Sequence, residues 1–280
     1  MIFKSNNTEL SVKKAVPFFT FPIFEKHKLL RHGFSTRLGG VSSNEFESMN
    51  FRFFGSETME NIIQNYRKFS QAVGVKFESL FSARQVHSDT VMIVTNKDKR
   101  DNTISSKNRQ IQNADGLITD QNNLTLITYH ADCTPIFFFD PLKKIIALAH
   151  SGFKGTAKEI ASKIIVKMHT EFLCNPEDII CAIGPTISQK CYEVDDAVYE
   201  KFRNKPWIIE SCFIKSEKNN NRYMLSLKKA NEEILKRSGI KPENIYVSDI
   251  CTHCFSDMLF SHRAMGEKRG VMAAALCMTS

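Results

Sequence analysis

The sequence predicts an α/β or α+β fold with mixed sheets, organised as one domain over residues 1–280. Runs of β-branched and aromatic residues crowd the middle of the chain, and segments with a 3.6-residue apolar period flank them. Two polar stretches, NKDKRDNTISSKNRQIQN (96–113) and SEKNNNR (216–222), are typical of surface loops or hairpins. Neither is long enough to separate two domains.

Strand signals dominate the central region. The predicted strands are VMIVT (91–95), GLITD (116–120), LTLITYH (124–130), IFFFD (136–140) and IIALAH (145–150), with VMAAALCM (271–278) closing the chain. The fourth and fifth form a predicted hairpin through the Pro-containing turn PLKK. Cys133 then precedes one strand and His150 ends the other, so antiparallel pairing would bring both residues to one sheet edge.

Helices are predicted from apolar periodicity and end signals. They cover MENIIQNYRKFSQAVG (59–74), the segment after His150 (151–173), DDAVYEKFRN (195–204) and SLKKANEEILKRSG (226–239). The last begins with a Ser that can cap its first turn and ends in Gly239, as many helices do.

Composition narrows the function classes. The net charge of +8 comes from scattered basic residues with no long Lys/Arg block, which favours a solvated surface over a nucleic-acid partner. The N-terminus has no signal-peptide pattern and no apolar run is long enough to span a bilayer, so we expect a cytoplasmic protein without a membrane partner. The eight cysteines are then expected to be reduced thiols.

Three segments each place a soft metal ligand at the end of an apolar run: RQVHSD with His87, TYHADCTP with Cys133, and ALAHSGFKG with His150. His and Cys are ligands that Zn²⁺ prefers, and three protein ligands leave an open position, as in catalytic zinc sites. Taken singly, each residue has a simpler explanation, such as a surface His, a core Cys or a structural His at a strand–helix turn.

Other residues near these segments suit a reaction site. Asp132 is a candidate acid–base group, and His130 could hold a ligand by a hydrogen bond. Arg37, in the glycine-punctuated loop RHGFSTRLGGVS (31–42), and Lys154, in HSGFKGT, are candidate phosphate ligands. Arg263, near the closing strand, is a weaker candidate for a pocket wall.

One further motif, CTHC (251–254), has CxxC spacing but no second Cys or His pair. We therefore expect it to be structural rather than a zinc finger or a redox pair.

Together the segments resemble the laccase-domain, or YfiH-like, proteins, which have been called polyphenol oxidases, purine nucleoside phosphorylases and peptidoglycan editing factors. The resemblance runs in order from about residue 30 to residue 280. It is carried by HGFSTRLGGVS (32–42), SMNF (48–51), NYRKF (65–69), QVHSD (85–89), ADGLITD (114–120), HADCTPIFFFD (130–140), ALAHSGFKGTA (147–157), AIGPTISQKCYEV (182–194), FSHR and GVMAAAL.

The resemblance implies a four-layer α/β/β/α sandwich in which His87, Cys133 and His150 bind one Zn²⁺. It also implies phosphorolysis of adenosine, inosine and methylthioadenosine to the base and the ribose 1-phosphate, with adenosine deaminase activity. The expected partners are then a nucleoside and phosphate, and a monomer is expected. Cys133 and Asp132 become the candidate catalytic residues, and Asn50, in SMNF, joins Arg37 and Lys154 as a candidate substrate- or phosphate-binding residue.

Two departures from the family pattern stand out. Phe153-Lys154 replaces the usual Trp-Arg after His-x-Gly, and a Lys cannot make a bidentate contact. Leu225-Ser226-Leu227 replaces Leu-Asp-Leu, and Ser caps a helix much as Asp does.

Three other functions compete. In a cysteine hydrolase or amidase acting in peptidoglycan editing, Cys133 would be the nucleophile and His150 the base, with no metal role. A copper-dependent polyphenol oxidase fits poorly, because the chain has eight His and no HxH pair. A non-catalytic metal-binding or partner-binding protein is the third.

Overall fold

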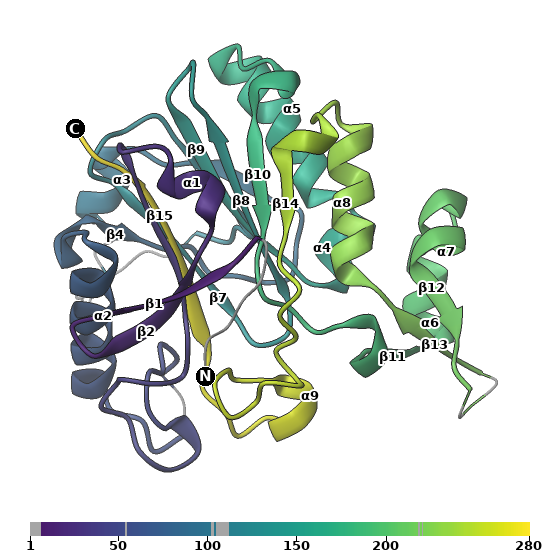
Figure 1. The fold of residues 1–280 in the computed structure, drawn as a ribbon, viewed down its shortest axis with the longest axis horizontal. Helices are drawn as coiled ribbons and strands as arrows, with labels where there is room; N and C mark the ends of the chain where they lie inside the picture. The colour runs from purple at the N-terminus through teal and green to yellow at the C-terminus, as the bar shows by residue number, and fades with distance from the viewer. Residues whose placement is uncertain (1–6, 54, 102–103, 105–111, 218, 220) are drawn as a thin grey trace.

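Two six-stranded sheets lie face to face with helices on their outer faces, as the ribbon shows (Figure 1). The computed structural model describes residues 7–53, 55–101, 104, 112–217, 219 and 221–280. The predicted four-layer α/β/β/α sandwich with mixed sheets is confirmed.

The first sheet is mostly antiparallel. Its strand order is β1 (Glu9–Lys13), β2 (Val16–Thr20), β3 (Leu30–Ser35), β15 (Met272–Met278), β7 (Thr125–His130) and β4 (Leu80–Phe81), and only the β4–β7 pair is parallel. Helix α2 (Met59–Val73) covers its outer face through Ile62, Tyr66 and Phe69. Its N-cap is Thr58, whose side chain accepts from the Asn61 N–H, and Gly74 ends it in the left-handed conformation.

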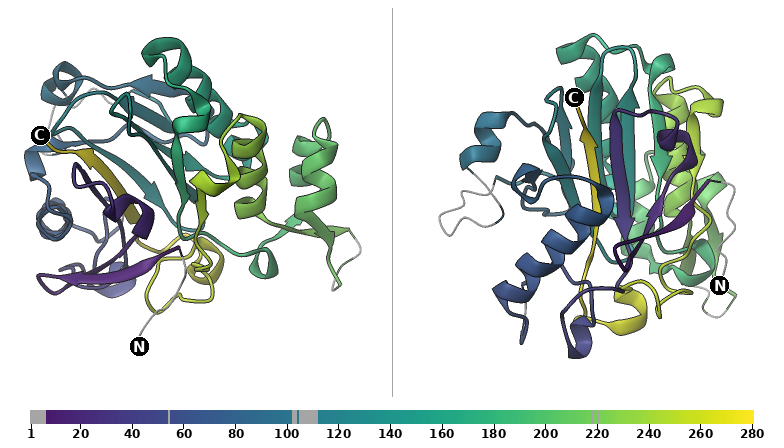
Figure 2. Two further views of the ribbon diagram at one scale, coloured as in Figure 1. Left: turned by 45° about the horizontal axis from the view of Figure 1, so that its top comes forward. Right: turned by 60° about the vertical axis from the view of Figure 1, so that its left-hand side comes forward.

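The second sheet carries parallel pairs at both edges. Its order is β14 (Ile245–Val247), β10 (Ile180–Ile183), β8 (Thr134–Asp140), β9 (Ile145–Ser151), β6 (Gly116–Thr119) and β5 (Val91–Ile93). Helices α4 (Phe153–Ala157), α5 (Ile160–Phe172) and α8 (Leu227–Arg237) cover its outer face. Figure 2 shows α2 outside one sheet and α5 and α8 outside the other.

Strand β8 explains why the central strands are apolar throughout. Phe137 and Phe139 point into the core between the two sheets, whereas Ile136 and Phe138 point toward the helices. Because side chains alternate across a strand, a sheet that is covered on both faces needs apolar residues at every position.

The remaining elements are short. A third sheet, β11 (Glu193–Asp195), β13 (Arg222–Leu225) and β12 (Phe213–Lys215), lies with α6 (Asp196–Tyr199) and α7 (Pro206–Cys212) beside α8, at the right of Figure 1. The other helices are α1 (Pro22–Glu25), α3 (Asn96–Asp101) and α9 (His262–Met265). Single 3₁₀ turns span Asn44–Phe46, Phe77–Ser79, Pro176–Asp178, Gln189–Cys191, Glu200–Phe202 and Pro242–Asn244.

Most predicted elements are confirmed, with shifted ends. The β8–β9 hairpin forms as predicted, and the Asp140 carboxylate closes its turn by accepting from the N–H groups of Leu142 and Lys143. The segment after His150 splits into α4 and α5 at Glu159, which has a φ of 56°. Ser226 caps α8 as expected.

Two predictions need correction. RHGFSTRLGGVS is a loop only from its sixth residue, because its first five residues belong to β3, where Gly33 lies against the ring of Phe18 and leaves no room for a side chain. The stretch 96–113 begins with α3, and its residues 102–103 and 105–111 lie outside the described part of the chain. The stretch 216–222 follows β12 and ends at Arg222, the first residue of β13, and its residues 218 and 220 lie outside the described part of the chain.

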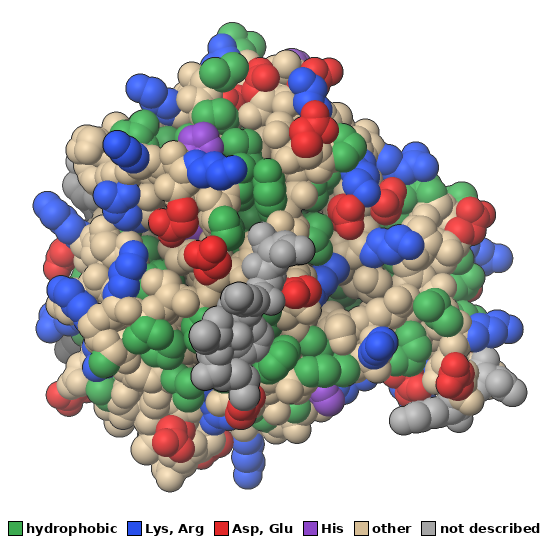
Figure 3. Space-filling model, viewed as in Figure 1, with side chains coloured by type: hydrophobic (Ala, Val, Ile, Leu, Met, Phe, Trp, Pro, Cys, Tyr) green, Lys and Arg blue, Asp and Glu red, His purple; other side chains and the backbone are tan. Residues whose placement is uncertain are grey.

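Lys and Arg side chains spread over the face in Figure 3, with Asp and Glu between them, rather than gathering in one patch. Within the residues that the structure describes, no helix combines the length and apolar character needed to cross a membrane.

Candidate metal centre

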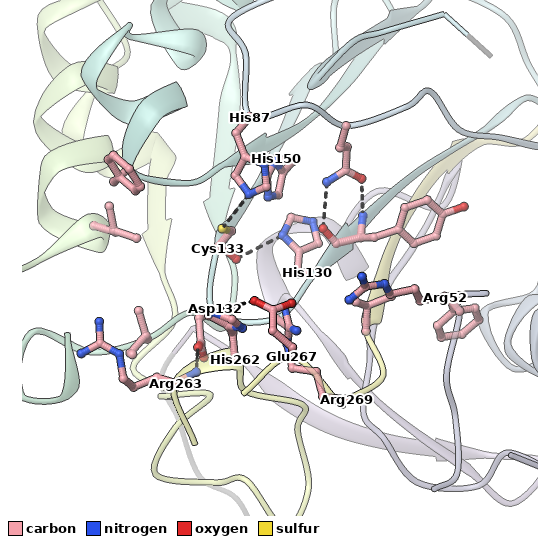
Figure 4. A pocket seen from close by; sticks show the side chains of 18 of the residues that line it. Arg52, His87, His130, Asp132, Cys133, His150, His262, Arg263, Glu267 and Arg269 are labelled. Carbon is pink, nitrogen blue, oxygen red and sulfur yellow. Dashed lines mark hydrogen bonds and ion pairs between the residues drawn. The ribbon is translucent and has the colours of Figure 1, made fainter. Parts of the chain in front are cut away.

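The fold brings the three predicted metal ligands together (Figure 4). His87 lies in the loop before β5, Cys133 in the turn between β7 and β8, and His150 near the end of β9, opposite Pro135 of β8. The Nε2 atom of His87 is 3.9 Å from the Sγ atom of Cys133, and the three ligand atoms all lie within 4.8 Å of one another.

These separations suit one metal ion. A tetrahedral zinc with bonds of about 2.0 Å to nitrogen and about 2.3 Å to sulfur holds its ligand atoms about 3.3–3.6 Å apart. The His87–Cys133 separation of 3.9 Å is only slightly longer than that spacing. Because the group has three protein ligands, a metal held there keeps one position open.

A buried carboxylate, Asp115, orients the group. The Nδ1–H of His150 donates to its Oδ1 atom at 2.8 Å, which turns Nε2 of the imidazole toward Cys133. Asp115 also accepts from the backbone N–H groups of Val86, His87 and Ser88, and so fixes the loop that carries His87. We did not predict this role from the sequence; the only signal was an Asp immediately before a buried strand.

Charge within the group favours a thiolate. Burial raises the pKa of Cys133, but the charge of His150 and hydrogen bonds from His150 and His87 lower it to about 6. Burial lowers the pKa of His150, but the Cys133 thiolate and the Asp115 hydrogen bond raise it to about 9. Without a metal, the two form a thiolate–imidazolium pair; a metal would replace the shared proton.

His130 supports the turn rather than joining the ligands. Its Nδ1–H donates to the Cys133 carbonyl at 3.1 Å, and its Nε2 accepts from the Thr128 hydroxyl at 2.8 Å, the tautomer that satisfies both partners. Burial lowers the pKa of His130 well below its ordinary value, so the ring is neutral.

Gly152 packs against the ligands. A Cβ atom at this position would lie 2.9 Å from the Cys133 Sγ and 3.2 Å from a ring carbon of His87. Only glycine leaves the sulfur and imidazole in place, which explains the first glycine of HSGFKGT.

The three ligands line a cavity of about 1020 Å³. Figure 4 shows the three ligands in the upper part of the view, Arg52 at the right, Arg269 below it and Arg263 at the lower left. The aromatic residues of the lining are Phe51, Phe53, Tyr129, Phe153 and Tyr192. The cavity therefore combines soft ligands, positive charge and flat apolar surfaces.

The arginines offer an anion site. Burial and the neighbouring charge of Arg52 lower the pKa of Arg269. The Nε of Arg269 is buried and has no hydrogen-bond partner within the described part of the chain. Two close guanidinium groups and a buried, unused donor favour binding of an anion between them.

Asp132 lies in the wall below Cys133. Its φ is 86°, and its carboxylate accepts from the Thr252 hydroxyl at 2.6 Å and from the Arg263 backbone N–H at 2.7 Å. It thus ties three wall segments together. Arg263 lines the cavity, as the sequence suggested.

The structure does not bring the predicted phosphate ligands into the cavity. The Arg37 guanidinium donates to the carbonyls of Glu47 and Ser256 and packs on the Phe260 ring. It holds surface loops together and is absent from the cavity lining. Lys154 is exposed on α4 and is also absent from the lining.

Asn50 is buried beside the cavity, where its side chain holds part of the cavity wall by hydrogen bonds. Its amide nitrogen donates to the Arg52 carbonyl and the Glu57 carboxylate, and its Oδ1 accepts from the N–H groups of Arg52 and Val271. Asn50 therefore positions Arg52, and its polar atoms are already engaged within the protein.

The chain is similar in sequence to known proteins. Residues 31–279 match the family model described as multi-copper polyphenol oxidoreductase laccase. The chain belongs to this laccase-like family. Among curated members of similar sequence, purine nucleoside phosphorylase YlmD of Bacillus subtilis is 33% identical over 254 residues, covering 91% of this chain and 90% of the relative.

Solved structures of laccase-like proteins share the fold. Hypothetical protein YfiH of Bacillus licheniformis superposes with a TM-score of 0.89 at 31% identity, covering 96% of this chain and 99% of that one. YlmD of Geobacillus stearothermophilus gives a TM-score of 0.87 at 30% identity, covering 97% and 99%.

Proposed function

We propose that this chain is a zinc-dependent purine nucleoside phosphorylase acting on adenosine, inosine and methylthioadenosine. The observation that carries the proposal is the open His87–Cys133–His150 group facing Arg52 and Arg269 across one cavity. The name of the Bacillus subtilis relative supports the same activity.

In the proposed reaction, different residues of the cavity bind the phosphate and the purine ring. Arg52 and Arg269 bind phosphate, and the aromatic walls take the purine ring. A phosphate oxygen then attacks C1′ of the ribose while the C1′–N9 bond breaks. The electron pair of the broken C1′–N9 bond stays with the base, which takes up a proton. The products are the free base and ribose 1-phosphate.

The donor set of the metal group suits Zn²⁺, because imidazole and thiolate together are ligands this ion prefers. When bound, the ion supplies Lewis-acid activation at its open position. Asp115 keeps His150 oriented for this role, and Cys133 supplies the negative charge.

We also propose that the protein deaminates adenosine as a side activity and that Asp132 carries the proton in that reaction. In deamination water adds to C6 of adenine and ammonia leaves, so one group must move a proton. Asp132 is close to the ligands, but both its oxygens already accept hydrogen bonds. The role therefore requires the loss of its bond to Thr252, and we expect deamination to be slower than phosphorolysis.

The first experiment measures adenosine turnover with and without phosphate, before and after chelation, with metal content by mass spectrometry. Adenine that forms only with phosphate, disappears on chelation and returns with Zn²⁺ would support the proposal. Metal-free protein with unchanged adenine formation would refute the zinc dependence. Absence of purine products from metal-loaded protein would refute the substrate class.

One observation favours a second candidate, a cysteine hydrolase or amidase. The thiolate–imidazolium pair of Cys133 and His150 is the arrangement that activates a cysteine nucleophile. Such an enzyme would cleave a peptide-like substrate through an acyl thioester, and chelation would leave its rate unchanged. An oxidase is disfavoured, since just one of the two potential metal groups among the described residues contains His.

A further inference from the structure

A second group of thiols lies behind the cavity wall. Cys191, Cys251 and Cys254 bring their sulfur atoms within 4.8 Å of one another, and the Sγ atoms of Cys191 and Cys254 are 3.4 Å apart. Cys251 and Cys254 are the CxxC motif, which the sequence analysis treated as structural because it lacked a partner. The fold supplies that partner from 60 residues upstream of Cys251, at the end of the 3₁₀ turn Gln189–Cys191.

The backbone holds the group in place without a metal. A β-bridge joins Thr186 to Cys251, and so connects the segment before Cys191 to the CxxC turn. The Cys251 sulfur accepts from the Ser188 N–H at 3.2 Å and from the backbone N–H of Cys254. Backbone N–H groups that point at a sulfur stabilise a thiolate, as around metal-bound cysteines.

A nearby ammonium group and access to solvent also favour the binding of an ion by these thiols. The ammonium of Lys228 donates to the Ile250 carbonyl at 2.8 Å and lies close enough to Cys251 and Cys254 to attract their thiolates. Cys251 is buried, whereas Cys254 is exposed. An ion can therefore reach the group from solution, and the negative charge of three thiolates is partly balanced.

We propose that Cys191, Cys251 and Cys254 form a second metal site, which binds a thiophilic d¹⁰ cation, Cu⁺ or Zn²⁺. Three sulfur donors exclude hard cations such as Mg²⁺ and Ca²⁺, which take oxygen ligands. Cu⁺ would be bound by the three thiolates alone, and Zn²⁺ would need a fourth ligand from solvent. Each thiol gives its proton to solvent when the ion binds.

A disulfide explains the group less well. It would join Cys191 to Cys254, require an external oxidant, and leave the third sulfur without a role. The N–H groups of Ser188 and Cys254 donate to the third sulfur, which such a disulfide would leave out. An ion between the three sulfur atoms would engage all of them.

The proposed site borders the reaction cavity and goes beyond the function proposed above. Tyr192, next to Cys191, lines the cavity, and Thr252, next to Cys251, donates to Asp132. The Arg263 side chain donates to the Cys191 carbonyl. An ion at the three thiols would therefore fasten together two segments of the cavity wall.

The test uses the reduced, full-length chain under anaerobic conditions, first stripped of metal. The Cys133→Ala variant removes the first centre, Cys254→Ser removes the second, and Cys181→Ala is the control, because Cys181 is buried in β10 outside both groups. Zn²⁺ and Cu⁺ are titrated separately against a competing chelator, and Co²⁺ reports the number of sulfur ligands by its charge-transfer absorbance.

We expect the unchanged chain and Cys181→Ala to bind two ions of Zn²⁺ and Cys133→Ala to bind one. The remaining ion in Cys133→Ala should show about three times the Co²⁺–thiolate absorbance of the ion in Cys254→Ser, in proportion to the thiolates bound. Tighter retention of Cu⁺ than of Zn²⁺ by Cys133→Ala would identify a three-coordinate site, and the reverse a site with a solvent ligand.

Three results would overturn the proposal. The first is that Cys133→Ala, shown to be folded by its unfolding midpoint, binds neither Zn²⁺ nor Cu⁺. The second is that Cys254→Ser binds as many ions as the unchanged chain. Peptide mapping that finds a Cys191–Cys254 disulfide in protein kept under reductant would also exclude the metal site.

Discussion

Two groups of soft ligands in one fold differ in what surrounds them. The first, His87, Cys133 and His150, mixes nitrogen with sulfur, has a buried carboxylate behind one imidazole and opens into a large cavity. The second has only sulfur ligands, with Ser188 and Lys228 beside them and one thiol exposed.

That difference separates two uses of the same residue type. An oriented imidazole and an open position facing a pocket suit a reacting centre. A group with only sulfur ligands that joins two segments of the cavity wall suits a structural role, in which a bound ion would hold the two segments together. Both groups have ligand types that suit a metal, and their surroundings favour different proposed uses.

Removing Cys133 should produce the largest effect. We expect Cys133→Ala to lose the first metal and to reduce nucleoside turnover by at least about 100-fold, because neither His can hold the ion in the same place. Metal content and phosphate-dependent adenine formation measure this. Cys254→Ser is the matched comparison and should keep the first metal and most of the turnover. Equal losses in both variants would mean that the two groups do not have separate uses.

Asp115→Asn tests what the carboxylate adds to the first group. The amide cannot offer two acceptor oxygens to the loop of His87 and loses the charge that orients His150. We expect affinity for Zn²⁺ to fall about 10–100-fold. Competition with a chromophoric chelator measures it, and ion binding at the sulfur-only group should stay the same. An unchanged affinity at the first group would show that Asp115 has only a structural role.

Arg269→Ala tests the cavity that distinguishes the first group. Loss of a charged donor should raise the KM for phosphate about 10-fold, with a smaller change in kcat. Lys154→Ala, at an exposed cation outside the cavity, is the control and should leave the KM for phosphate unchanged. The opposite pattern would restore the phosphate role predicted from the sequence for Lys154 and remove it from Arg269.

The smallest effect is a difference in thiol reactivity between the groups. In metal-free protein the pKa of Cys133 is about 6, so its thiolate should dominate at pH 7 and lose reactivity as the pH falls below 6. A hydrogen bond with Cys191 and burial raise the pKa of Cys254 to about 12, so this thiol should stay protonated and react slowly despite its exposure.

Iodoacetamide labelling between pH 5 and pH 9, followed by peptide mass spectrometry, measures both rates in one sample. Added Zn²⁺ should protect Cys133. Faster labelling of Cys254 than of Cys133 at pH 7 would show that exposure rather than charge controls these thiols.

Much of the fold could be predicted because its signals are local. The β8–β9 hairpin depends on two apolar runs and a Pro-containing turn, and α2 and α8 depend on periodicity and caps within the same segments. Strand β3 was mistaken for a loop because Gly33 looks like a turn residue. It is a glycine only because the Phe18 ring of a neighbouring strand leaves no space.

The candidate site, like the fold, contains some residues that the sequence predicted and others that it did not. His87, Cys133 and His150 stand at the ends of apolar runs. The predicted hairpin brings Cys133 and His150 together, and the family resemblance adds His87 to them. Arg52 and Arg269 carry no such pattern. Arg37 looked like an anion ligand in its glycine-rich loop, yet backbone carbonyls from distant segments occupy its guanidinium.

The sequence by itself determined the main strands and helices and the three candidate metal ligands, because apolar runs, periodicity and end signals are local to each segment. The layers of the sandwich and the meeting of all three ligands at one ion were expected only from the resemblance to the laccase-domain proteins. The tertiary structure decided which charges face the cavity, that Asp115 orients His150, and that Cys191 completes the CxxC motif. Those contacts join residues far apart in the chain, and only the packing of the sheets and loops sets the distances between them.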